Sequence, residues 1–180
     1  MPDPVLHTER LTLRPLTAER AAALLDARHE APTANDAPTP ADGFPTVGDA
    51  QVLRGVVASG ADAHGSFVVE QHGLPVGTAG AAGGLSPDGD QEIGYGLVPG
   101  ARRQGLGTEA VGALCAYLES RPCVRRLTAE VLPGNAASLR LLRTLGFTEV
   151  DGGTDGRQLL ARSVPGEPTV RTRITGRHVC

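Results

Sequence analysis

The chain has 180 residues, a formal net charge of −3, 40% hydrophobic residues and 3% aromatic residues. This length and apolar content suit one domain that buries a substantial core. The negative charge and the few aromatic rings argue against nucleic acid as the main partner, because nucleic acid needs basic surface and single strands stack on aromatic side chains. No apolar run reaches the roughly 18 residues of a membrane span, so we expect a cytoplasmic protein without a membrane partner.

All 17 residues counted as lysine or arginine are arginine. The absence of lysine excludes a Schiff-base lysine and a Walker-type phosphate loop, both of which require that side chain. Arginine binds phosphate oxygens as a planar fork, so a phosphate-bearing ligand stays open. The 3 cysteines lack the paired spacing of a zinc site, and no metal is expected.

The first part of the chain predicts a strand, a helix and a long loop. In TERLTLRPLT, Leu11 and Leu13 alternate with polar residues, as in a half-buried strand. Thr17 is a suitable N-cap for a helix that buries Leu24. The stretch over residues 31–50 is rich in Pro, Asp and Gly and is predicted to be a loop, and loops of this length are often functional.

A second helix is predicted over residues 49–59, followed by three strands. The segment GSFVVEQHGLPVGTAGAAG predicts two strands joined by a turn at His72 and Gly73. After a further turn at SPDGD, QEIGYGLVP over residues 91–99 predicts the next strand. Short turns between successive strands favour antiparallel neighbours.

The second half of the chain alternates helices and strands. A helix over residues 105–119 leads to the strand RRLTAEVLP, which predicts a parallel crossover. The helix NAASLRLLRTLG ends at Gly146, which suits the C′ position, and FTEV and RQLLARSV predict two final strands. We expect a single domain over residues 1–164 and a flexible tail over residues 165–180.

The glycine-rich stretch LVPGARRQGLGTEA falls where a strand ends and a helix begins. Free N–H groups and the helix dipole make such a place an anion site. Gly105 and Gly107 let the backbone approach a ligand closely, and Arg102 and Arg103 add positive charge at the rim. The stretch therefore predicts a phosphate cradle.

A dinucleotide-binding turn is the rival interpretation of the same stretch. Gly105, Gly107 and Ala110 match G-x-G-x-x-A, and Glu130 lies about 20 residues further on, as that fingerprint asks. The context differs, because antiparallel strands precede the turn and only one more helix follows. We therefore rank an NAD-dependent oxidoreductase below the alternatives.

Two segments together carry a resemblance to a known family. VPGARRQGLGTEA resembles motif A of the GNAT acyltransferase superfamily, R/Q-x-x-G-x-G/A, with Arg102, Gly105 and Gly107. NAASLRLLRTLGF resembles its motif B, with Asn135 and Ser138. TERLTLRPLT and EIGYGL are similar to the branch that contains ribosomal-protein N-terminal (alanine) acetyltransferases, and the resemblance covers roughly residues 6–163.

The resemblance implies an α/β (α+β) fold with a mixed, mostly antiparallel sheet flanked by about four helices. The fourth strand would carry a bulge at Gly94–Gly96 and splay from the fifth, so that the pantetheine arm of acetyl-CoA lies between them. Asn135 would bond the pantetheine or cap its helix. The other implied cofactor-binding residues follow the splay and the loop: Leu97, Val98, Arg102, Arg103, Gln104, Gly105, Leu106, Gly107 and Thr108.

The reaction that the resemblance implies is direct acetyl transfer to a primary amine. The amine must lose a proton before attack, and Glu92 is the candidate base, with Asp90 as the alternative. Ser138 is the candidate hydroxyl on the thiol side. Many members of the superfamily place a tyrosine seven residues after the motif-B asparagine, where this chain has Leu142.

We therefore expect an acetyl-CoA-dependent N-acetyltransferase that acts on a protein N-terminus or a small amine. A non-catalytic module that binds acyl-CoA is the second hypothesis, and the oxidoreductase is the third. The loop over residues 31–49 would line the acceptor site, with Asp36 and Asp42 as groups that attract a cation. Dimers are usual in this superfamily, which leaves a homodimer as an option.

Overall fold

The computed structural model describes residues 3–26, 41–60 and 63–164. The first half comprises β1 (Leu6–His7), β2 (Thr12–Pro15), α1 (Ala18–Asp26), α2 (Val47–Ser59), β3 (Ser66–Gln71), β4 (Leu74–Ala82) and β5 (Asp90–Leu97). The second half comprises a short 3-10 helix (Pro99–Ala101), α3 (Leu106–Glu119), β6 (Arg126–Val131), α4 (Ala136–Thr144), β7 (Thr148–Val150) and β8 (Gln158–Ser163). The predicted tail over residues 165–180 lies outside the described residues.

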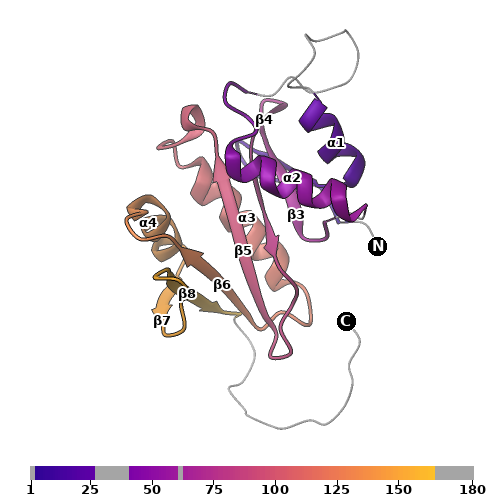
Figure 1. Cartoon of the computed structure of the whole chain (residues 1–180). Helices are drawn as coiled ribbons and strands as arrows, with labels where there is room; N and C mark the ends of the chain where they lie inside the picture. Colours follow the sequence, from indigo (N-terminus) through magenta and orange to yellow (C-terminus); the bar gives the residue numbers. More distant parts are fainter. Residues whose placement is uncertain (1–2, 27–40, 61–62, 165–180) are drawn as a thin grey trace.

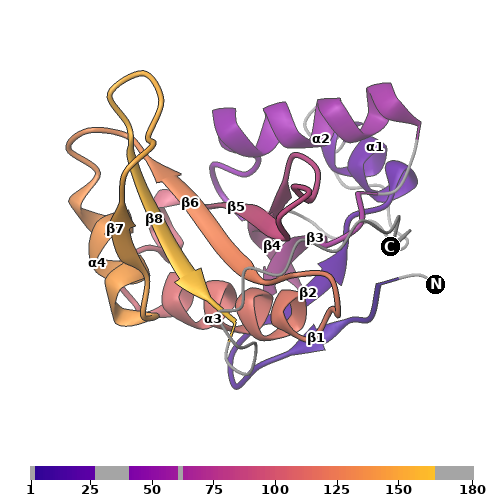
Figure 2. The ribbon, with the colours of Figure 1, turned by 90° about the horizontal axis from the view of Figure 1, so that it is seen from below.

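The described strands form one sheet in the order β1-β2-β3-β4-β5-β6-β8-β7. Neighbouring strands are antiparallel except β5 and β6, which are parallel because α3 crosses between them. Seen from below, α1 and α2 lie on one side of the sheet, and α3 and α4 on the other (Figure 2). The predicted mixed, mostly antiparallel sheet with its helices is confirmed.

The sheet splays between β5 and β6, as predicted. These strands pair only from Asp90 with Arg126 to Glu92 with Thr128, and they then diverge (Figure 1). Beyond that point β5 stays paired with β4 and β6 with β8. The predicted bulge in β5 is wrong, because its ladder with β4 runs from Ala82 to Gly77 without a shift. The register shift lies instead in the β3–β4 pair, between Val69 and Glu70.

Side-chain caps set the helix ends. The Thr17 hydroxyl accepts from the Arg20 amide at 3.1 Å, which confirms Thr17 as the N-cap of α1. α2 begins at Val47, two residues earlier than predicted, because Thr46 and Asp49 form a capping box. Gly146 takes a φ of 83° after α4, which confirms its predicted C′ role.

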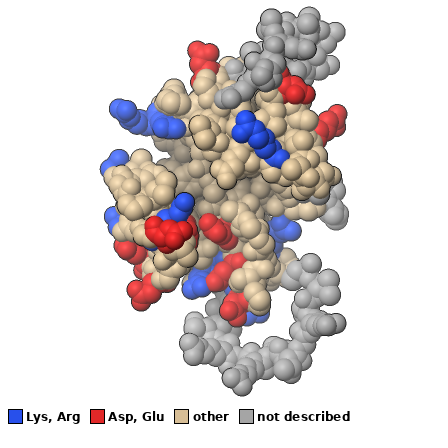
Figure 3. All heavy atoms as spheres, in the orientation of Figure 1, with Lys and Arg blue, Asp and Glu red and all other residues tan. Residues whose placement is uncertain are grey.

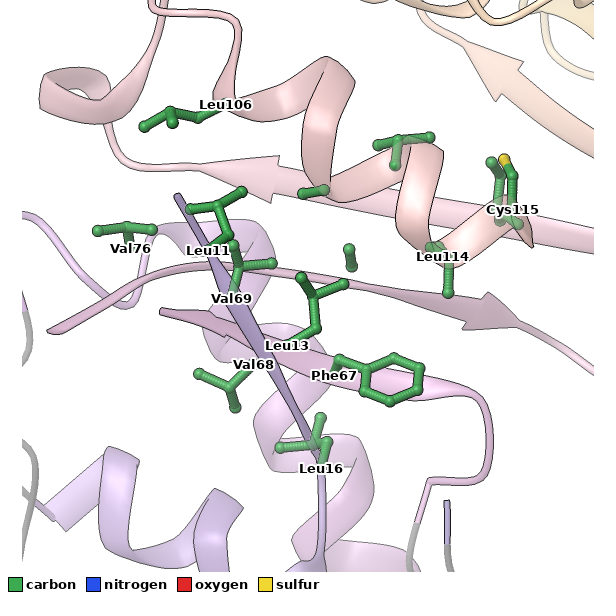
Figure 4. Close-up of a cluster of buried hydrophobic side chains, with 14 of the residues drawn as sticks. Leu11, Leu13, Leu16, Phe67, Val68, Val69, Val76, Leu106, Leu114 and Cys115 are labelled. Atoms are coloured by element: carbon green, nitrogen blue, oxygen red, sulfur yellow. The ribbon is translucent and has the colours of Figure 1, made fainter. Parts of the chain in front are cut away.

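The main core lies between the sheet and α3. Figure 4 shows Leu114 of α3 directed toward strand residues that include Leu13 and Phe67. Leu11 and Leu13 are both buried, which confirms the predicted strand alternation. Burial raises the pKa of the Cys115 thiol to about 11, so this cysteine is an inert core residue.

Within the described ranges, the helices are all too short or too polar to cross a lipid bilayer.

Candidate active site

The end of β5 leaves backbone groups free on the side that faces β6. The Val98 amide donates to the Val76 carbonyl of β4 at 2.9 Å. Since hydrogen-bonding positions alternate along an antiparallel pair, the N–H and C=O groups of Tyr95 and Leu97 point into the gap. Arg102 Nε donates to the Leu97 carbonyl there at 2.8 Å. The gap therefore has a backbone edge at Leu97, whereas the Val98 amide is committed to β4 and its side chain is buried.

The turn over residues 102–108 presents unpaired amides to the same gap. Its φ angles are positive at Arg103 (60°) and at Gly105 (79°), and Gly105 is the N-cap of α3. No amide of residues 103–108 donates to another group within the described residues. These N–H groups and the positive end of the α3 dipole make the turn an anion site.

The two glycines of this turn have different roles. Gly105 is required by its positive φ, which a side chain makes costly. A Cβ on Gly107 would lie 3.0 Å from the Leu141 side chain of α4. Gly107 therefore permits the close approach of α3 and α4.

A brace from the β1–β2 turn holds the glycine-rich turn in place. Arg10 Nε donates to the Glu109 carboxylate, and Arg10 Nη1 to the Gln104 carbonyl, each at 2.8 Å. Burial works to raise the pKa of Glu109, but hydrogen bonds from Thr8 and Arg10 outweigh it and lower that pKa. The Gln104 side chain donates to the Gly100 carbonyl at 2.8 Å, so it stabilises the turn. The sequence patterns gave no signal for this brace.

The start of α4 supplies polar groups on the opposite side of the gap. Asn135 is the N-cap of α4, and its side-chain oxygen accepts from the Ser138 amide at 3.2 Å. The Ser138 side chain itself lines the gap. Leu142 is fully buried in the core, so the place that a tyrosine would take in the resembling proteins serves packing in this chain.

The turn, the end of β5 and α4 enclose a cleft of about 630 Å³. Figure 3 shows this face hollowed at the upper part of the splay, with acidic side chains over the lower half of β5 and β6. Eight of the predicted site residues line the cleft: Leu97, Arg102, Arg103, Gly105, Gly107, Thr108, Asn135 and Ser138. The other predicted cofactor-binding residues do not line it: Val98 and Leu106, which are buried, and Gln104.

Glu92 lies apart from the cleft lining, at the point where β5 leaves β6. Its exposed side chain is partly desolvated, which raises its pKa; nearby Glu130 raises the pKa further, and Arg157 lowers it. Asp90 is held by Arg126, whose Nε donates to it at 2.8 Å. Of the two candidate bases, Glu92 is therefore the one without an ion-pair partner among the described residues.

Tyr95 of β5 also lines the cleft. Within the described residues its buried hydroxyl has no hydrogen-bond partner, which is costly for a buried polar group. Burial raises the pKa of Tyr95, the Ser138 side chain lowers it, and Cys115 adds to the increase. The phenol therefore stays protonated at neutral pH beside Ser138.

A second cavity, of about 250 Å³, lies on the opposite side of β5 under α2. It shares Tyr95 and Gly96 with the cleft, so the two cavities meet at this point of β5. Thr46 and Asp49 of the predicted 31–49 loop line it, which places the end of that loop at a cavity. Asp42 is exposed, and Asp36 lies outside the described residues.

A sheet that opens beside an anion-binding turn is the architecture of an acyl-CoA-dependent transferase. Residues 10–148 match the acetyltransferase (GNAT) domain, and the chain belongs to this family. GNAT domains bind acetyl-CoA or CoA, and the cleft fits that ligand because it combines unpaired amides, arginines and the free backbone edge of β5. The family match decides against the dinucleotide interpretation of the turn.

Solved structures share the fold at low sequence identity. Ribosomal-protein-S5-alanine acetyltransferase from Vibrio fischeri is 21% identical, with a TM-score of 0.63, over 92% of this chain and 100% of that one. Mycobacterium smegmatis RimJ, in complex with CoA-disulfide, is 24% identical, with a TM-score of 0.57, over 90% and 88%. An acetyltransferase from Agrobacterium tumefaciens is 23% identical, with a TM-score of 0.62, over 90% and 95%. Among curated protein sequences, none matches this chain significantly.

Proposed function

We propose that this GNAT acetyltransferase is an N-acetyltransferase that moves the acetyl group of acetyl-CoA directly to a primary amine. The observation that carries the proposal is the open gap between β5 and β6 beside the unpaired amides of residues 103–108. A diphosphate at those amides would place an extended arm along Leu97. Ribosomal-protein acetyltransferases among the similar structures favour a protein N-terminus as the acceptor.

The residues on the cofactor side bind and orient. The amides of residues 103–108, with Arg102 and Arg103 at the rim, hold the diphosphate through charge-assisted hydrogen bonds. The Tyr95 and Leu97 backbone groups bond the arm as a neighbouring strand would. When bound, acetyl-CoA supplies an activated acetyl group as a thioester.

Proton handling falls to three side chains. Glu92 takes a proton from the incoming ammonium, directly or through water, and the burial that raises its pKa makes it a stronger base. Ser138 lines the cleft and is the first candidate to donate a proton to the departing sulfur, and the buried Tyr95 hydroxyl is the second candidate. The Tyr95 phenol has no other partner in the described residues, which leaves its proton available.

The proposal is tested by mixing the purified protein with acetyl-CoA and a panel of amines while free thiol is followed. Thiol release that requires an amine, with the acetylated amine found by mass spectrometry, is the expected result. Tight CoA binding by calorimetry without thiol release for any amine would instead support the non-catalytic acyl-CoA-binding module.

A further inference from the structure

The cavity under α2 carries features that the cofactor does not need. Its floor is the face of β5 and β4 that carries Gly94, Gly96 and Thr78, because even-numbered residues of the two strands share one side. A Cβ on Gly94 would find no atom closer than 4.0 Å, and one on Gly96 none closer than 3.7 Å. The glycines therefore keep the floor of the cavity open, since a side chain at either position would extend into it.

One charged group sits at the wall of this cavity. Asp49 is only 2% exposed, and the atom nearest to a Cβ on Gly96 would be its Oδ1. Thr78 Oγ1 donates to Asp49 Oδ1 at 2.7 Å, while the Thr46 amide and hydroxyl donate to Oδ2 at 2.9 and 2.6 Å. These contacts fix the carboxylate with one oxygen directed toward the glycine floor.

No basic side chain within the described residues forms an ion pair with Asp49. The neutral donors offset only part of the cost of burying an ionised carboxylate. A cation that enters the cavity from outside would supply the missing charge. The other strongly buried carboxylate, Glu70, forms ion pairs with Arg14 and Arg20. Among the described residues, Asp49 is therefore the strongly buried carboxylate without an ion-pair partner.

The cavity also lies in the right place for an acceptor. It meets the cofactor cleft at Tyr95 and Gly96, next to the backbone edge that would hold the thioester end of the arm. Glu92 is on the same face of β5 as Gly94 and Gly96, about 13 Å along the strand from Gly96 at roughly 3.3 Å per residue. An acceptor in the cavity would thus lie between two carboxylates.

We infer that Asp49 is the specificity-determining residue of the acceptor site, where it binds the primary ammonium of an acceptor whose first substituent is small. This inference rests on the proposed function. The cavity volume of about 250 Å³ suits the first residue of a peptide or a small aliphatic amine. Asp49 holds and orients the ammonium, and its proton reaches Glu92 through water, because the two carboxylates lie too far apart for direct transfer.

The test measures KM for two probes, a tetrapeptide amide that begins with alanine and 1,4-diaminobutane, in the native protein and in Asp49→Asn. Asparagine keeps an oxygen for the two Thr46 donors, and its NH2 group can donate to the Thr78 hydroxyl, but it removes the charge. KM for the preferred probe should rise at least about tenfold, because a buried charge loses its partner, while CoA affinity stays unchanged. The probe with the lower native KM identifies a peptide or a small amine as the source of the ammonium.

A competition arm separates charge recognition from a purely structural role. The free tetrapeptide amide should compete at least about tenfold better than its N-acetylated form in the native protein. Asp49→Asn should lose this preference, whereas Asp26→Asn, which removes an exposed carboxylate at the end of α1, should retain it. A KM within about twofold of native in Asp49→Asn, or a retained preference for the free amine, would overturn the inference.

A second variant keeps the test decisive if Asp49→Asn does not fold. Gly94→Val places a side chain in the open floor and should raise KM for the amine without changing CoA affinity. Gly84→Val, at an exposed glycine with equal space, is its matched control. If the native protein acetylates no amine, the proposed function fails; calorimetric binding of the tetrapeptide to the CoA-loaded protein, with and without Asp49→Asn, then decides on Asp49 separately.

Discussion

The two cavities that meet at Tyr95 and Gly96 are built from opposite kinds of groups. The larger one is lined by unpaired main-chain amides and arginines, whereas the smaller one has glycines, threonine hydroxyls and a buried carboxylate. The first set of groups suits an anion, and the second suits the cation proposed above. On that proposal, a single strand would separate the two ligands by charge and let them meet where its backbone is exposed.

The largest expected effect is on kcat when Glu92, the proposed base, is replaced. Glu92→Gln should lower kcat about 100-fold, because the incoming ammonium loses its base. The loss should be greatest between the raised pKa of Glu92 and the amine pKa of about 8, where the carboxylate is ionised but the amine is still protonated. Rates measured from pH 5 to pH 9 check this.

The control for Glu92 is Asp88→Asn, which removes an exposed carboxylate from the β4–β5 turn and should leave kcat unchanged. A Glu92→Gln enzyme with the same acidic limb in its pH profile as the native protein would assign the proton transfer to another group.

A change confined to the anion side should affect the cofactor alone. Gly105→Val forces a β-branched residue to the φ of 79° and should weaken CoA binding about 100-fold by displacing the amides. Calorimetry with CoA measures this. Gly100→Ala, in the same segment but with open space and no positive φ, should bind normally. Equal affinities for the two variants would remove the turn from the binding site.

Tyr95→Phe tests a residue at which the two cavities meet. Removing the hydroxyl should lower kcat about tenfold and leave KM little changed, because the departing sulfur loses a proton donor. The melting temperature should not fall, since this hydroxyl has no partner to lose within the described residues.

The matched variant is Tyr117→Phe, whose hydroxyl donates to Asp3. It should lose about 1 kcal/mol of stability and keep the native kcat. If Tyr95→Phe instead destabilises the protein without slowing it, Tyr95 is a packing residue.

The smallest expected effect comes from weakening the Arg10–Glu109 brace that holds the glycine-rich turn. Glu109→Gln should weaken CoA binding about threefold and cost about 1 kcal/mol of stability, because this largely paired carboxylate is close to the surface. Its pKa is lowered in the fold, so its contribution is present at neutral pH and is lost as the pH falls through that lowered value. Thermal unfolding from pH 3 to pH 7 should show the difference from native narrowing toward acid.

The sequence patterns predicted what depends on neighbours along the chain. The turn over residues 102–108 and the capped start of α4 are contiguous segments, so glycines, arginines and Asn135 were readable in order. The period-2 pattern likewise placed Leu11 and Leu13 inward. The one local signal that was overlooked is Thr46 and Asp49 at capping-box spacing, which sets the true start of α2.

The remaining features depend on contacts between distant residues. Arg10 meets Glu109 across 99 positions, and Asp49 meets Thr78 across 29. No spacing rule connects such pairs, because the sheet register and helix placement decide them. The expected bulge at Gly94–Gly96 was wrong for a related reason: those glycines do not alter the pairing of β5 with β4, which the sheet register decides.

The seam between β5 and β6 consists of three paired positions. The wedge formed by β6, β7, β8 and α4 is therefore joined to the rest of the sheet over less than half the length of β5. An extended ligand in the opening would bridge β5 and β6 where they are not paired, as an added strand would. The motion of this wedge relative to the rest of the sheet would then differ between the free and the acetyl-CoA-bound protein.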